Sequence, residues 1–176
     1  MKNKIGHIPE DRLTRGLITE MSVARNEILG YHDDPLFSSH GFLKEKAIEK
    51  YAEDAIKEYE IKTPNGKELA SSLSGGNQQK IVVSRVIKQN PDVLIVAQPT
   101  RGVDVGAMEN IHHRILNLKK DGKSVLLVSA DLDEVYNLSD RIAVMYDGKI
   151  VAVLDKNATN HIELGLLMTG GKRENE

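Results

Sequence analysis

Residues 73–80 read LSGGNQQK and stand between a charged amphipathic segment and the most apolar run of the chain. A serine followed by two glycines, running into the apolar residues of 81–87, predicts a helix with Ser74 as its N-cap. Gly75 and Gly76 leave the backbone bare, and the free N–H groups at such a helix start suit a phosphate oxygen. From the residues alone, an ordinary helix start that binds nothing remains equally open.

Three further stretches, in order on both sides of this one, carry a family resemblance. LSGGNQQK resembles the signature motif of ATP-binding-cassette (ABC) ATPases. Residues 5–12 (IGHIPEDR) are similar to the Q-loop region in the second cassette of carbohydrate-import ATPases, and residues 91–107 (PDVLIVAQPTRGVDVGA) resemble a Walker B strand and D-loop. Residues 125–145 resemble the switch-loop strand and the segment after it. The likeness covers nearly the whole chain and is nearest to the carboxy-terminal cassette of nucleoside and simple-sugar uptake proteins.

The resemblance implies an α/β fold. We expect part of a P-loop ATPase (ABC cassette) core with parallel strands and helices, an α-helical signature subdomain and a C-terminal β-hairpin. The implied domains are a Q-loop region (1–12), a helical subdomain with the signature motif and signature helix (13–90), an α/β core (91–158), and a C-terminal helix with a polar tail (159–176). Residues 13–72 would include the surface that touches a membrane-spanning subunit.

Apolar periodicity supports this organisation independently. The continuous apolar runs 93–97 and 124–129, separated by a helical pattern, predict buried strands of a parallel crossover unit. Asp147-Gly148 between the apolar segments 141–146 and 149–154 predicts a β-hairpin. Further helices are predicted over residues 21–30, 43–59 and 159–168, with a loop at 31–41.

Composition excludes several classes of function. The 176 residues suffice for one domain with a sizeable core, and a net charge of −2 with both signs interspersed predicts no nucleic-acid partner. The absence of cysteine excludes disulfides and thiolate metal sites and fits a reducing compartment. No apolar run approaches the roughly 18 residues needed to span a bilayer. We therefore expect a cytoplasmic protein, peripheral on the inner face of the membrane through a permease.

A phosphate-binding loop, GxxxxGK[ST], is absent from the sequence. Residues 117–124 (NLKKDGKS) imitate its end but begin with Asn117 in place of glycine and precede a strand, which predicts a turn. In the family the loop and the first strands would lie ahead of residue 1, so we expect an amino-terminal truncation. Its loss should leave the flanks of 93–97 and 124–129 uncovered, which favours self-association.

No metal site is predicted from the histidines. His32 and His40 have no companion at ligand spacing, and the adjacent His112 and His113 face apart on a helix.

The positions that would carry hydrolysis in the family are replaced here. Where the resemblance expects a magnesium-supporting aspartate and a catalytic glutamate after the Walker B strand, the chain has Ala97 and Gln98. Alanine offers no ligand, and glutamine cannot accept a proton; losing a general base typically costs about 10² to 10⁴ in rate. Ala130 occupies the place of the switch histidine, and Glu10 that of the Q-loop glutamine, where a carboxylate could approach magnesium. We expect no working hydrolytic centre in this chain.

The residues that act on a partner's nucleotide are retained. The resemblance implies that Ser74, Gly75 and Gly76, with Gln78 of the same motif, close over the terminal phosphate of ATP held by the opposite cassette. Asp104 resembles the D-loop aspartate of that interface, a role compatible with capping the next helix. ATP and Mg are thus expected in the full complex, with the opposite cassette and an integral membrane permease as partners.

Two hypotheses remain. The first is the carboxy-terminal nucleotide-binding domain of an ATP-driven importer for nucleosides or simple sugars, which donates its signature motif. The alternative is a non-catalytic, cassette-derived interaction module. A cassette with a phosphate loop encoded in frame upstream of Met1 would favour the first, and a stop codon there the second. An ABC protein of nucleic-acid maintenance is disfavoured by the absence of a basic face.

Overall fold

The computed structural model describes residues 4–171. Parts of the predicted Q-loop region (1–3) and of the polar tail (172–176) lie outside the described residues. The chain divides into two compact units, Met1–Leu126 and Leu127–Glu176. Each unit has a buried apolar cluster of its own.

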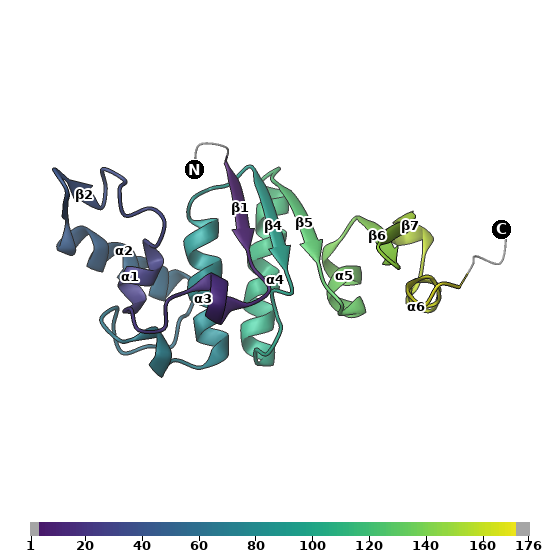
Figure 1. Cartoon of the computed structure of the whole chain (residues 1–176), viewed down its shortest axis with the longest axis horizontal. Helices are drawn as coiled ribbons and strands as arrows, with labels where there is room; N and C mark the ends of the chain where they lie inside the picture. The colour runs from purple at the N-terminus through teal and green to yellow at the C-terminus, as the bar shows by residue number, and fades with distance from the viewer. Residues whose placement is uncertain (1–3, 172–176) are drawn as a thin grey trace. The chain divides into compact units, whose positions relative to one another are not determined.

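The first unit is built on a sheet with the strand order β1-β4-β5 (Figure 1). Its strands are β1 (Ile5–Ile8), β4 (Val93–Ala97) and β5 (Ser124–Val128), the last of which continues to the first two residues of the second unit. β1 and β4 pair in parallel, with Ile5 opposite Val93 and Ile8 opposite Val96. Leu94 and Val96 are fully buried, but Val93 is exposed and Ile95 is only half-buried, so the predicted cover on both faces is found on one face of β4 alone. No residue of β5 is fully buried, contrary to the prediction. The predicted parallel α/β fold class is confirmed.

The expectation of uncovered strand flanks holds in part: both edges of β4 are paired, but Val93 of β4 and Leu126 and Val128 of β5 are exposed. Among the described residues β4 has β1 on one edge and β5 on the other, so its hydrogen-bonding groups are paired on both sides. β5 lies at the end of the sheet, and its Leu126 is 57 % exposed. The sequence could not show that residues 5–8, an apolar piece of only four residues, form the strand that covers β4.

Among the described residues this unit has four α-helices: α1 (Val23–Glu27), α2 (Glu45–Glu58), α3 (Gly75–Ile87) and α4 (Val105–Lys120). α1 packs against both α2 and α3, and α3 also contacts β1 and α4. The apolar residues that recur at helical spacing along α2 lie on the side of the helix that packs against α1. This small core consists of Ala24, Ile28, Phe37, Ile48 and Ala52, with Tyr31 and Tyr51 against it.

Several short elements were not predicted. They are the π-helical turn η1 (Arg12–Gly16), the strands β2 (Ser38–Ser39) and β3 (Phe42–Leu43), and the 3-10 turn η2 (Ala70–Ser72). β2 and β3 form a small hairpin at the end of the predicted loop 31–41, with His40 (φ 52°) and Gly41 (φ 82°) in its turn. Elements this short contain too few residues to show the periodicity from which helices and strands are predicted.

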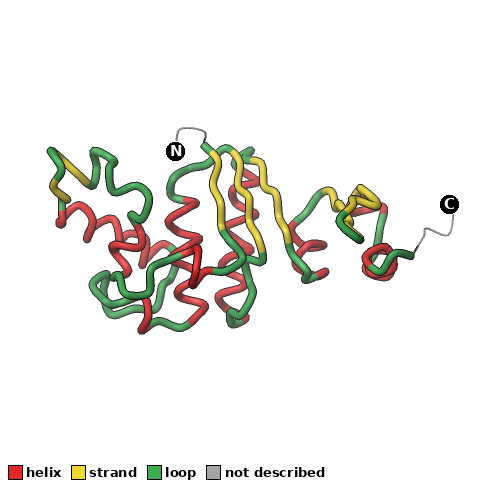
Figure 2. Tube along the Cα trace, viewed as in Figure 1, coloured by secondary structure: helices red, strands yellow, loops and turns green. Residues whose placement is uncertain are grey.

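The second unit contains α5 (Leu132–Leu138), β6 (Arg141–Tyr146), β7 (Lys149–Asp155), the 3-10 turn η3 (Lys156–Ala158) and α6 (His161–Met168), shown by type in Figure 2. The predicted C-terminal hairpin is confirmed as β6–β7, and its turn has Asp147 at φ 47° and Gly148 at φ 73°, as Asp-Gly predicts. One face of the hairpin packs on α6. Its core is Ile142, Val144, Leu154, Leu164 and Leu167.

Candidate functional site at the start of the signature helix

Ser74 is the N-cap of α3, as predicted. Its backbone is extended (φ −62°, ψ 156°), and its Oγ accepts hydrogen bonds from Asn77 N at 3.5 Å and from Asn77 Nδ2 at 2.9 Å. Asn77 is itself held through its Oδ1, which accepts from Lys62 N at 2.8 Å. Because Ser74 Oγ is the acceptor in both contacts, its own hydroxyl proton remains available to donate.

The D-loop turn lies directly against the signature glycines. A Cβ added to Gly76 would come within 2.7 Å of Asp104 Oδ2 and 3.0 Å of Ala107 Cβ. Asp104 is the N-cap of α4: its Oδ1 accepts from Ala107 N at 3.0 Å, and this hydrogen bond lowers the pKa of the carboxyl. The structure therefore brings Gly76 and Asp104 into contact, and a side chain at position 76 would require the Asp104 carboxylate to move.

Gln78 is engaged with its own chain. The side chain is 8 % exposed, and its Nε2 donates to Ala70 O at 2.9 Å. This bond ties the signature helix to η2. A role for Gln78 toward a nucleotide stays a prediction.

Glu10 and Gln98 follow neighbouring parallel strands. Each lies two residues beyond the paired Ile8 and Val96, so both stand at the same edge of the sheet. Glu10 forms an ion pair with Arg101, and both side chains are more than half exposed. Such an exposed pair contributes little stability, but it directs the Glu10 carboxylate to a cation of its own chain.

The end of β4 does not fit a magnesium site. The side chain of Ala97 has no atom that could bind a metal ion. Gln98 has a left-handed backbone conformation (φ 47°), and its carbonyl oxygen accepts a hydrogen bond from Arg101 N at 3.2 Å. Within residues 4–171 no group of three or more His, Cys, Asp or Glu side chains is arranged to hold a metal ion. Ala130 follows β5 in the second unit and is exposed. That this strand end supports no metal-dependent step of its own stays a prediction.

A buried polar cluster joins α1 to the C-terminal half of α3. Glu27 is 0 % exposed; Ser84 Oγ donates to its Oε1, and its Oε2 is buried without a hydrogen-bond partner. Arg85, 7 % exposed, donates to Asn26 O at 3.1 Å and also to Gly16 O. This cluster was not predicted, because polar residues at apolar-face positions look like ordinary surface residues in a sequence.

Burial raises the pKa of Glu27 to about 8 from its ordinary 4.5, against the opposing effects of Ser84, Lys88 and Arg85 and with a small contribution from Glu58. Between these two pH values the folded chain keeps a proton that the unfolded chain releases. The contribution of Glu27 to stability is therefore greatest below about pH 4.5 and falls as pH rises toward about 8.

We expect Glu27→Gln to flatten this pH dependence and to be more stable than the unmodified chain near pH 8. The measurement is urea unfolding across this pH range. Glu53→Gln, which changes an exposed carboxyl on α2, is the matched control and should leave the slope unaltered. Equal slopes for the Glu27→Gln variant and the unmodified chain would show that Glu27 is ionised in the folded state.

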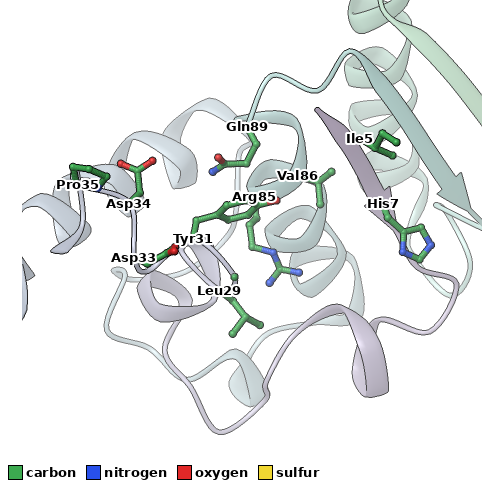
Figure 3. Close-up of a pocket in the computed structure, with 11 residues that line it drawn as sticks. Ile5, His7, Leu29, Tyr31, Asp33, Asp34, Pro35, Arg85, Val86 and Gln89 are labelled. Atoms are coloured by element: carbon green, nitrogen blue, oxygen red, sulfur yellow. The ribbon is translucent and has the colours of Figure 1, made fainter. Parts of the chain in front are cut away.

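Arg85 also borders a pocket of about 680 Å³ (Figure 3). The pocket is bounded by β1, by the loop after α1 and by the end of α3. Aliphatic, aromatic, basic and acidic side chains share its wall, among them Ile5, His7, Tyr31, Asp33, Asp34, Arg85 and Gln89. No pattern in the sequence points to it, because its residues come from three separate segments.

Known proteins resemble this chain over most of its length. A family model described as "ABC transporter" matches residues 1–101. The chain is 47 % identical over 170 residues to the nucleoside import ATP-binding protein NupA of Lactococcus lactis, covering 97 % of this chain and 34 % of that protein. It is 46 % identical over 171 residues to the guanosine import ATP-binding protein NupO of Bacillus subtilis, covering 97 % and 33 %. The ribose import ATP-binding protein RbsA of Shouchella clausii is 37 % identical, with 98 % and 34 % covered. The chain thus spans about a third of the length of these relatives.

Solved structures agree with the fold. A dimeric, post-hydrolysis ATP-binding cassette bound to ADP and Pi has a TM-score of 0.69 at 26 % identity, covering 88 % of this chain and 64 % of that one. A nucleotide-free ATP-binding cassette from an ABC transporter has a TM-score of 0.64 at 25 % identity, covering 91 % and 63 %. Across residues 4–171, none of the helices combines the length and apolar character required to cross a bilayer.

Proposed function

Since this chain belongs to the ABC transporter family, we propose that it acts in the carboxy-terminal nucleotide-binding cassette of an ATP-driven importer for nucleosides or simple sugars. The names of its relatives, which are import ATP-binding proteins for nucleosides, guanosine and ribose, support this substrate class. The domain limits expected from the sequence form part of this proposal.

The observation that carries the proposal is the contact between Gly76 and Asp104. This contact places the signature motif and the D-loop side by side in one chain, so that both can contact the same opposite cassette. At that surface Ser74 has a hydroxyl proton to donate, and the first N–H groups of α3, including those of Gly75 and Gly76, have no partner within the helix. These are the donors we assign to the terminal phosphate of ATP bound at the opposite cassette.

The chain is proposed as a donor to that composite site and not as a recipient of its own nucleotide. Ala97 and Gln98 supply neither a metal ligand nor a general base, and Glu10 is paired with Arg101. Alanine at position 130 supplies no imidazole. ATP and its magnesium ion would be held by the opposite cassette, and the role of this chain is to close over them.

The same proposal includes a membrane partner. We place the contact with the permease on the helical segment between β1 and β4, where the pocket of Figure 3 offers a concave surface with Tyr31 and Asp34 on one wall. Its mixed aromatic and charged lining suits a partner helix end with a basic group. The location that this implies is the inner face of the cell membrane, reached through the permease.

We expect the isolated 176-residue chain to release phosphate from ATP no faster than buffer with magnesium alone. The reason is that it has no phosphate loop and no general base after β4. The measurement is a coupled phosphate assay, with the purified chain at several concentrations to expose trace contamination. Turnover that rises with the chain and disappears in Gln98→Ala would overturn the division of roles.

A further inference from the structure

Arg12, the last residue of the Q-loop stretch 5–12, lies between the signature motif and the D-loop, a contact that the sequence did not predict. It is the first residue of η1, and its side chain crosses to the turn that precedes α4, where Nη1 donates to Arg101 O at 3.0 Å. Its Nε is buried from solvent without a hydrogen-bond partner. Burying a guanidinium nitrogen without a hydrogen-bond partner costs free energy. The side chain is therefore held in place by packing contacts with its surroundings as well as by its hydrogen bond to Arg101 O.

Two bare glycines form those surroundings. A Cβ on Gly75 would overlap Arg12 Nη2 and come within 3.2 Å of its Cζ, and within the same distance of Gly102 O. A Cβ on Gly102 would lie 3.8 Å from Nη1 and 3.9 Å from Nη2. The flat guanidinium therefore lies between the start of the signature helix and the D-loop turn. A side chain at position 75 would obstruct this slot, whereas a Cβ at position 102 would be in ordinary van der Waals contact with the guanidinium.

The base of Arg12 is fixed as well. Asp11 caps η1, since its Oδ1 accepts from Leu13 N at 2.9 Å and Thr14 N at 3.2 Å, and its Oδ2 accepts from Thr14 Oγ1 at 2.8 Å. With both ends held, Arg12 connects the segment after β1 to α3 and to the turn before α4.

We propose that Arg12 is a positioning residue that holds the signature motif and the D-loop turn in register, so that they meet a partner's nucleotide as one surface. Arg12 itself touches no nucleotide in this proposal. The inference rests on the proposed function for its consequence, whereas the contact among Arg12, Gly75 and Gly102 stands without it. Arginine suits the task because its planar fork fills a flat slot and keeps a donor on each side, which a lysine ammonium does not.

The first test is a double-mutant cycle on the 176-residue chain without nucleotide. Gly75→Ala should shift the folding equilibrium about tenfold toward the unfolded state when Arg12 is present, because the methyl group displaces the guanidinium. In an Arg12→Ala background the same change should cost much less, since the slot is empty. Additive effects would overturn the proposed contact.

A position-specific readout accompanies the cycle. Arg12→Ala should speed hydrogen exchange at the amide of Val103, which donates to Thr100 O within the turn, by about tenfold. Arg15→Ala is the matched control, because Arg15 lies exposed in the same turn η1, and should leave that amide unchanged. Equal exchange in the two variants would mean that Arg12 does not hold the turn.

The second test uses the assembled transporter that contains this sequence, with ATP as the probe. Arg12→Ala should lower kcat about tenfold with little change in KM for ATP, because the nucleotide is held by the opposite cassette, and Arg12→Lys should restore part of the loss. Arg15→Ala should retain full activity. Coupling in the isolated chain without any effect on kcat would refute the proposed function of the surface and leave the contact intact; loss of kcat without coupling would refute the positioning role itself.

Discussion

Replacing Gly75 by aspartate should lower the substrate-stimulated ATPase of the assembled transporter by about 10² to 10³, the range found when a preorganised donor to a reacting oxyanion is lost. The added side chain places a negative charge where we assign a triphosphate, and its Cβ would overlap Arg12 and crowd Gly102 O. Aspartate is favourable in the first turn of a helix, so α3 should still form. The loss is therefore expected mainly in turnover, in addition to the smaller folding cost of the added Cβ against Arg12.

Two companion variants make this result specific. Ser74→Ala removes one donor and the cap of α3 and should give an intermediate loss. Gln98→Ala should be mild, because the strand end that it follows already lacks a metal ligand. Phosphate release by the reconstituted complex gives the order, and thermal unfolding of each variant provides the folding control. If Gln98→Ala abolished activity while Gly75→Asp was tolerated, the chemistry would have to run through this cassette's own β4.

Replacing Asn26 by alanine should lower the free energy of unfolding of the isolated chain by about 3 kcal/mol or more, since several buried backbone groups lose their partner at once. Asn26 is 0 % exposed. Its Oδ1 accepts from Ile18 N at 2.8 Å, and its Nδ2 donates to Ile18 O at 2.9 Å, Met21 O at 3.2 Å and Ser22 O at 3.1 Å. One side chain thus closes the loop between η1 and α1.

Asn117→Ala is the control for this variant. Asn117 also lies in a helix, α4, but its side chain is exposed. Replacing either asparagine by alanine should raise helix propensity by a similar amount, but Asn117→Ala leaves no buried group without a hydrogen-bond partner. Urea unfolding followed by circular dichroism compares the two. A difference below about 0.5 kcal/mol would mean that water satisfies the loop when the amide is removed.

Local pattern was sufficient for much of the fold. β4, the hairpin β6–β7 and the N-caps Ser74 and Asp104 follow from apolar runs, an Asp-Gly turn and cap residues, all of which act over a few residues. The boundaries of α2 and α6 moved inward by one or two residues from their predictions, as fraying ends do.

The parts that could not be predicted depend on contacts between distant positions. Arg12 reaches a carbonyl 89 positions away, and Ser84 reaches a carboxylate 57 positions away. No local signal marks either pair. The resemblance pointed Glu10 toward magnesium, whereas its ion pair with Arg101 arises because two neighbouring parallel strands end together. The positive φ of Gln98 could not be predicted either, because it is imposed by the turn after β4, and glutamine rarely adopts this conformation.

The pairing of β1 with β4 also sets an order of events during folding. Ile5 pairs with Val93, so the first strand must wait for the whole helical segment between them before it finds its neighbour. α1, α2 and α3 contact one another within that segment, and nearer contacts cost less chain entropy to close. On a ribosome the helices would therefore assemble first, and their compaction would bring the two strand ends together as β4 emerges. The helical segment that separates β1 from β4 in the sequence thus also brings the two strands together during folding.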